Sequence, residues 1–106
     1  MNIDDPFDQP IDDALPELLQ AEWGADQVMK LFDDLRDGAE VEHVQMRAAK
    51  DDRTTTLAEA KLAFADGSAQ AIQVRYRFEG EMWCDTILPS EQTTKIIRTR
   101  LPQNNW

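Results

Sequence analysis

Two pairs of arginines, Arg75 with Arg77 and Arg98 with Arg100, have the two-residue spacing that places side chains on one face of a β-strand. Between these pairs, Trp83 and Asp85 have the same spacing. If all six share one sheet face, that face combines guanidinium groups with an indole ring. Arginine and tryptophan are enriched among the residues that dominate protein interfaces. The candidate partner-binding residues are therefore Arg75, Arg77, Trp83, Asp85, Arg98 and Arg100.

The same face would also suit a polyanion, with a base stacked on Trp83 and phosphates on the arginines. The sequence lacks the aromatic RNP1 pattern of RNA-binding sheets, so nucleic acid is the weaker alternative. A purely structural alternative pairs Arg75 or Arg77 with Asp85 across strands, for about 0.2 to 1 kcal/mol. Protein contact is favoured, through a homodimer, a separate partner or the chain's own acidic N-terminal segment.

Cys84 and His43 are the only cysteine and histidine, and with Asp85 they could form a nucleophilic triad. Strand alternation instead groups Cys84 with Met82 and Leu88, toward the core, where burial makes a thiol inert. One cysteine and one histidine complete neither an intrachain disulfide nor the usual zinc ligand sets. No glycine-rich nucleotide motif occurs. We expect no catalytic residue, no cofactor and no metal.

The charge is divided along the chain. Residues 1–40 contain twelve acidic and two basic residues and so carry the whole net charge of −10, while residues 41–106 are balanced. In charge alone this front end resembles a DNA-mimicking inhibitor, which we keep as an alternative. Pairs such as Asp33 and Asp34 are more simply solvated than catalytic, although an acidic helix face could also meet a partner.

The length of 106 residues predicts a single domain. We assign residues 1–12 to a flexible acidic tail, residues 13–101 to one α+β domain and residues 102–106 to a C-terminal tail. The sequence contains neither an apolar run of membrane-spanning length nor a signal peptide at its start. The expected location is the cytoplasm, without membrane contact.

Two helices are predicted near the N-terminus. The first starts at Pro16, which suits a first helical turn, and stops at Gly24. The second covers residues 26–36, because its apolar residues recur at helical spacing, and Gly38 would end it. Its apolar stripe consists of Val28, Leu31, Phe32 and Leu35.

Residues 41–65 are ambiguous between helix and strand. We favour a strand over 41–49, a polar turn over 50–55 and another strand over 56–65, because Asp66-Gly67 is a strong hairpin signal. Clearer strands follow over 71–78, 82–88 and 94–101, with a turn at Glu79-Gly80. Together these elements predict two N-terminal helices packed on one face of a four- to five-stranded antiparallel meander sheet.

In this arrangement the helices cover the face that carries Ile72, Val74, Tyr76 and Phe78. The arginines would lie on the opposite face with Trp83, Asp85, Ile87 and Ile96. The expected function is that of a small, non-catalytic accessory or regulatory module that binds protein through this Arg/Trp face and an acidic helix.

Overall fold

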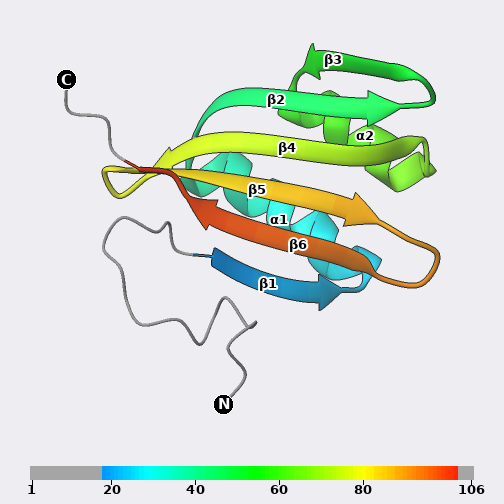
Figure 1. The fold of residues 1–106 in the computed structure, drawn as a ribbon, viewed down its shortest axis with the longest axis horizontal. Helices are drawn as coiled ribbons and strands as arrows, with labels where there is room; N and C mark the ends of the chain where they lie inside the picture. The colour runs from blue at the N-terminus through cyan, green and yellow to red at the C-terminus, as the bar shows by residue number, and fades with distance from the viewer. Residues whose placement is uncertain (1–17, 103–106) are drawn as a thin grey trace, which may run out of the picture.

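The computed structural model describes residues 18–102, which form a six-stranded antiparallel sheet and two helices (Figure 1). The predicted α+β class is confirmed, but the helices alternate with strands instead of both preceding the sheet. Across the sheet the strand order is β1-β6-β5-β4-β2-β3. In chain order the elements are β1 (Leu18–Trp23), α1 (Ala25–Gly38), β2 (Glu40–Ala48), β3 (Asp51–Thr55), α2 (Leu57–Asp66), β4 (Ala69–Phe78), β5 (Glu81–Pro89) and β6 (Thr94–Arg100).

Both helices pack on the same face of the sheet, and Figure 1 looks onto the other face with the helices behind it. The core lies between these two layers. Helix α1 supplies its predicted apolar stripe, all four residues of which are buried. Strand β4 supplies Ile72, Val74 and Tyr76, each at most 3 % exposed, as the alternation predicted. Phe78 lies on the same side but beyond the core, and it is 43 % exposed.

The segment 56–65, which the sequence analysis assigned to a strand, is helix α2. Thr56 caps this helix by accepting a 3.1 Å hydrogen bond from the backbone N–H of Glu59. Gly67 ends the helix with a left-handed φ of 83°, so Asp66-Gly67 forms a helix C-cap and not a hairpin turn. Glycine with positive φ serves both structures, which explains the error.

The predicted helix from Pro16 to Gly24 is wrong over the described residues. Leu18–Trp23 is strand β1, which pairs antiparallel with β6 from Leu18 opposite Thr99 to Trp23 opposite Thr94. A helix of two turns is barely stable in water, whereas the edge of β6 offers a ladder of backbone hydrogen bonds. Gly24 is the N-cap of α1, where its N–H donates to the Gln27 side chain at 3.2 Å.

The predicted polar turn over 50–55 is also mostly a strand. Only Ala49 and Lys50 form the turn, and β3 pairs with β2 from Ala48 opposite Asp51 onward. The Arg47 guanidinium holds the Asp52 carboxylate across the two strands with hydrogen bonds of 2.9 and 3.0 Å. This cross-strand pair supports an edge strand that has almost no apolar residues.

The turn between β4 and β5 fixes which side chains face the helices. Glu79 and Gly80 have φ angles of 53° and 82°, as in a two-residue type I′ hairpin turn. Phe78 is therefore opposite Glu81, and Tyr76 is opposite Trp83. Directly opposite residues share a face, so Trp83, Asp85 and Ile87 lie on the helix side. The prediction that they lie on the uncovered side is wrong.

Neither described helix is long and apolar enough to cross a membrane. The predicted tail over 1–12 lies outside the described residues, as does the tail over 102–106 except for Pro102.

Candidate functional site

The structure separates the six candidate residues into two groups. Arg75 and Arg77 lie on the uncovered sheet face, which we call the open face. The other four, from β5 and β6, face the helix side through the pairs Val74–Asp85, Tyr76–Trp83, Asp85–Arg98 and Trp83–Arg100. The single Arg/Trp surface expected from the sequence therefore does not exist.

Asp85 is the centre of a buried polar cluster. Its side chain is 0 % exposed and accepts two hydrogen bonds of 2.8 Å from Arg98, through Nε and one terminal nitrogen. The Tyr76 hydroxyl donates a third bond of 2.9 Å to the same carboxylate. Burial, followed by the charge of Asp85, raises the pKa of Tyr76, and the hydrogen bonds to Asp85 raise the pKa of Arg98. These raised pKa values keep the Tyr76 phenol neutral and the Arg98 guanidinium charged at neutral pH.

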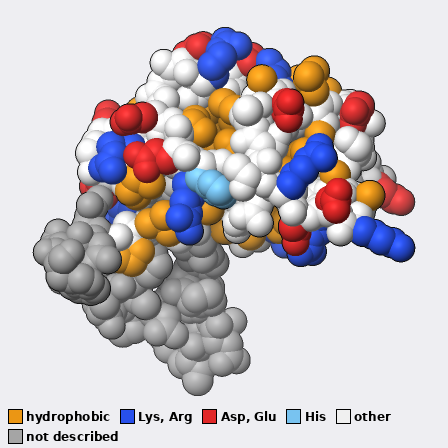
Figure 2. Space-filling model, turned by 90° about the horizontal axis from the view of Figure 1, so that it is seen from above, with side chains coloured by type: hydrophobic (Ala, Val, Ile, Leu, Met, Phe, Trp, Pro, Cys, Tyr) orange, Lys and Arg blue, Asp and Glu red, His pale blue; other side chains and the backbone are white. Residues whose placement is uncertain are grey.

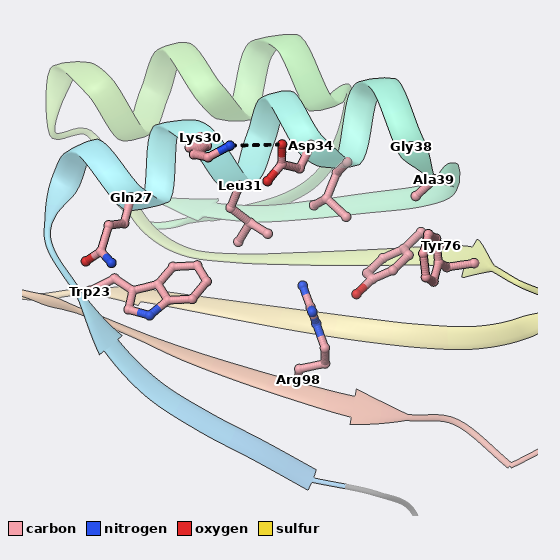
Figure 3. A pocket seen from close by; sticks show the side chains of 11 residues that line it. Trp23, Gln27, Lys30, Leu31, Asp34, Gly38, Ala39, Tyr76 and Arg98 are labelled. Atoms are coloured by element: carbon pink, nitrogen blue, oxygen red, sulfur yellow. Dashed lines mark ion pairs between the residues drawn. The ribbon is translucent and has the colours of Figure 1, made fainter.

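A cavity of about 430 Å³ lies next to this cluster, between α1 and the sheet (Figure 3). Trp23 at the end of β1 and Tyr76 on β4 lie at opposite ends of the view, and Arg98 rises from β6 between them. The α1 wall is aliphatic at Leu31 and Leu35, while Lys30 and Asp34 also line the cavity and form a 3.7 Å ion pair at its solvent-exposed rim. The cavity is therefore mainly apolar, with one guanidinium group at its floor.

The open face carries a smaller hollow of about 260 Å³ over β2, β4 and β5. Arg75 lines it, and His43 stands directly opposite Arg75 on β2 as an exposed strand residue. Arg77 lies 3.5 Å from Glu42, so the predicted alternative pairing of Arg75 or Arg77 with Asp85 is wrong. Among residues 18–102, Arg75 has no ion pair.

Beside this hollow, the outward side of β5 and β6 carries four half-buried apolar residues among Thr86, Thr99 and Lys95. Met82, Cys84 and Leu88 alternate on β5, and Ile97 on β6 stands opposite Thr86 on the same face. The prediction that Cys84 points into the core is wrong, because Cys84 is opposite Arg75 and is only partly buried. Even so, partial burial raises the pKa of its thiol, which makes it a weak nucleophile.

The acidic face of α1 is neutralised by its own neighbours. Asp33 accepts a 2.6 Å hydrogen bond from Lys61 on α2, and Arg36 holds Asp37 at 2.8 Å. Seen from above, toward the β3 edge, acidic, basic and apolar side chains are interspersed (Figure 2). Neither a continuous basic track for a polyanion nor an ordered acidic surface appears in this view.

The remaining two candidate residues, Arg100 and Trp83, each have contacts within the sheet and core. Arg100 donates a 3.1 Å hydrogen bond to Glu81, so this guanidinium has a local partner, and Trp83 packs partly buried against the core. Within residues 18–102, no three histidine, cysteine or acidic side chains gather as metal ligands would.

The residue patterns in the sequence did not indicate the cavity. Its aromatic wall residue Trp23 was assigned to a short helix, and Tyr76 was treated only as a core residue. A signal was present, because a two-residue loop at Glu79-Gly80 places Asp85 opposite Val74, among core side chains. An acidic residue at such a position needs a basic partner, and Arg98 is the strand residue opposite it.

Comparison with known proteins gives no relative: no protein-family description, no curated protein and no solved structure matches this chain.

Proposed function

We propose that this protein is a non-catalytic binding module whose open face takes an acidic, amphipathic segment of a partner protein. The observation that carries the proposal is the group of apolar residues on the outward side of β5 and β6, which lies between Arg75 on β4 and Lys95 on β6. These apolar residues are Met82, Cys84, Leu88 and Ile97. A sheet with helices on one side normally turns polar residues to solvent on the other. An apolar patch with a polar rim is typical of an interaction surface.

The charges favour an acidic partner segment. Arg77 forms an ion pair with Glu42, and Arg47 forms one with Asp52. Arg75 has no ion pair among residues 18–102 and stands opposite Cys84. A carboxylate placed over Arg75 would meet an uncompensated cation, while apolar side chains on the same segment would cover Cys84 and Ile97. Electrostatic steering of this kind makes association slower as salt rises.

Self-association and polyanion binding have less support. A net charge of −10 makes two copies of the chain repel each other. A polyanion would meet Glu42 and Asp52 close to the arginines of the open face. The acidic face of α1 is internally paired, so the proposed contact surface centres on the sheet.

The test uses tagged wild-type protein and two charge reversals in a pull-down from host lysate treated with nuclease. Arg75→Glu changes the open face, and Arg53→Glu changes an exposed β3 arginine as a matched control. The partner should be captured by wild type and Arg53→Glu and lost with Arg75→Glu. It should also protect Cys84, the only thiol, from alkylation.

Capture by all three baits, or unchanged alkylation of Cys84 in the complex, would contradict the proposal. A wild-type dimer in sedimentation that Arg75→Glu converts to monomers would assign the open face to a second copy instead. Arg98, which the sequence analysis grouped with Arg75, is unsuitable for such tests because Arg98→Glu would place a second carboxylate against Asp85.

A further inference from the structure

The second site that we propose is the cavity between α1 and the sheet, which we infer binds a small monocarboxylate with an apolar body. This site is separate from the open face, because Arg98 and Tyr76 point to the helix side of the sheet (Figure 3). Its volume of about 430 Å³ falls in the range of small-molecule sites, which are concave, mostly apolar and provided with few polar groups.

The cavity walls suit an apolar body. One end is closed by the Trp23 indole, and Leu31 and Leu35 line the α1 side. The ring of Phe78, which is 43 % exposed, lines the cavity beyond the core. When a ligand covers an aromatic ring that is this exposed at the border of an aliphatic groove, apolar surface leaves water, and this makes the free energy of binding more favourable.

The cavity floor offers a guanidinium group in a fixed orientation. Among residues 18–102, Arg98 uses Nε and one terminal nitrogen to hold Asp85, and its other terminal nitrogen makes no hydrogen bond to this carboxylate. The guanidinium carbon lies 5.9 Å from the centre of the Tyr76 ring. The Arg98 side chain is 34 % exposed and lies along the cavity. A buried ion pair is often no more stabilising than apolar side chains of similar volume. Here it orients a cationic donor beside an apolar space, as binding sites require.

These features select the head group of the ligand. The terminal nitrogen of Arg98 that does not bind Asp85 only donates hydrogen bonds, so the ligand must present an acceptor. A carboxylate is favoured over a neutral oxygen, because hydrogen bonds between two charged groups are the stronger ones. A quaternary ammonium group has no acceptor and would be repelled by Arg98.

The test measures decanoate, below its micellar concentration, against decyltrimethylammonium, which has the same chain length and the opposite charge. A Trp83→Phe/Trp106→Phe background leaves Trp23 as the only tryptophan, so its fluorescence reports ligands in the cavity. Salt of about 0.3 M screens the net charge of the protein. We expect saturable decanoate binding at least tenfold tighter than that of the cation, or about 1.4 kcal/mol.

Two variants test whether Arg98 causes the preference for decanoate over decyltrimethylammonium. Asp85→Leu/Arg98→Met removes both charges together, and Arg98→Lys keeps a cation for Asp85 while presenting no second nitrogen to the cavity. Each should lower the tenfold preference to threefold or less, and Arg98→Lys decides the matter if the double variant does not fold. Arg75→Gln on the open face should leave decanoate binding unchanged.

Three outcomes would overturn the inference. The first is the lack of a saturable Trp23 response to decanoate. The second is an undiminished preference in the folded Arg98 variants. The third is loss of decanoate binding in Arg75→Gln, which would place the ligand on the open face.

Discussion

The carboxylate of Asp85 is fully buried, and both of its oxygens accept 2.8 Å hydrogen bonds from the guanidinium of Arg98 on the neighbouring strand. The two residues are directly opposite in the β5–β6 ladder. Such a bidentate pair fixes geometry as well as charge. On its other side Asp85 stands opposite the buried Val74 of β4. Among the described residues, Asp85 is the only charged residue that is buried.

Breaking the pair from one side should strongly destabilise the protein. Arg98→Met leaves the Asp85 carboxylate buried with the Tyr76 hydroxyl as its remaining partner, and we expect a loss of about 3 to 5 kcal/mol. Asp85→Leu/Arg98→Met should recover at least the wild-type stability, since apolar pairs often replace buried ion pairs without cost. Urea unfolding measures both. Equal losses in the single and double variants would refute this account.

Tyr76 is the only tyrosine, so its ionisation can be followed by the absorbance of tyrosinate. Burial and the adjacent Asp85 raise its pKa, so the folded state favours the neutral phenol. Its contribution to stability is complete below the unfolded pKa of about 10 and is lost as the pH rises through the folded pKa. We expect no tyrosinate signal before unfolding in alkali. A reversible titration near pH 10 in folded protein would contradict this.

Sequence patterns predicted the parts of the fold in which local signals agree with tertiary packing. Helix α1 has an apolar stripe at helical spacing, and β4 has a strict alternation that a shift of one residue would reverse. The patterns failed where packing decides: β1 forms because β6 offers a free edge, and β3 forms beside β2 with little apolar content. No local property of those two segments indicates the neighbouring strand.

The candidate site was half predictable for a related reason. The arginine spacing correctly identifies strand residues, but spacing does not say which face a strand presents. That choice depends on loop length, and the two-residue loop at Glu79-Gly80 puts Trp83 and Asp85 on the helix side. The loop between β5 and β6 is longer, so its register cannot be counted from the sequence in the same way.

The Glu79-Gly80 turn provides a test of this register. Gly80 has a φ of 82°, which an L-residue adopts at a cost of about 1 to 2 kcal/mol, so Gly80→Ala should lower the free energy of unfolding by that amount. Glu79→Asn should be stabilising, since asparagine tolerates the left-handed φ of 53°. Gly38→Ala, which meets no atom within 4 Å and has a negative φ, is the matched control. Equal effects of Gly80→Ala and Gly38→Ala would disprove the assigned turn.

The Thr56 cap should stabilise α2 measurably. Thr56→Ala removes the acceptor for the N–H of Glu59, and we expect a loss of about 1 kcal/mol in thermal or urea unfolding. Thr54→Ala removes an exposed threonine of β3 and should have a much smaller effect. If segment 56–65 were the strand that the hairpin signal suggested, Thr56→Ala would be no more harmful than Thr54→Ala.

The pairing of the first described strand with the last has a consequence for synthesis on the ribosome. Among the described strands, β1 pairs only with β6, whose residues Thr94–Arg100 are translated long after Leu18–Trp23. Strands β2, β3 and β4 have neighbours that are close in sequence and can pair earlier. During translation, the backbone groups of β1 therefore lack this partner until Thr94–Arg100 have been synthesised, and only then can Trp23 take its place at the end of the cavity.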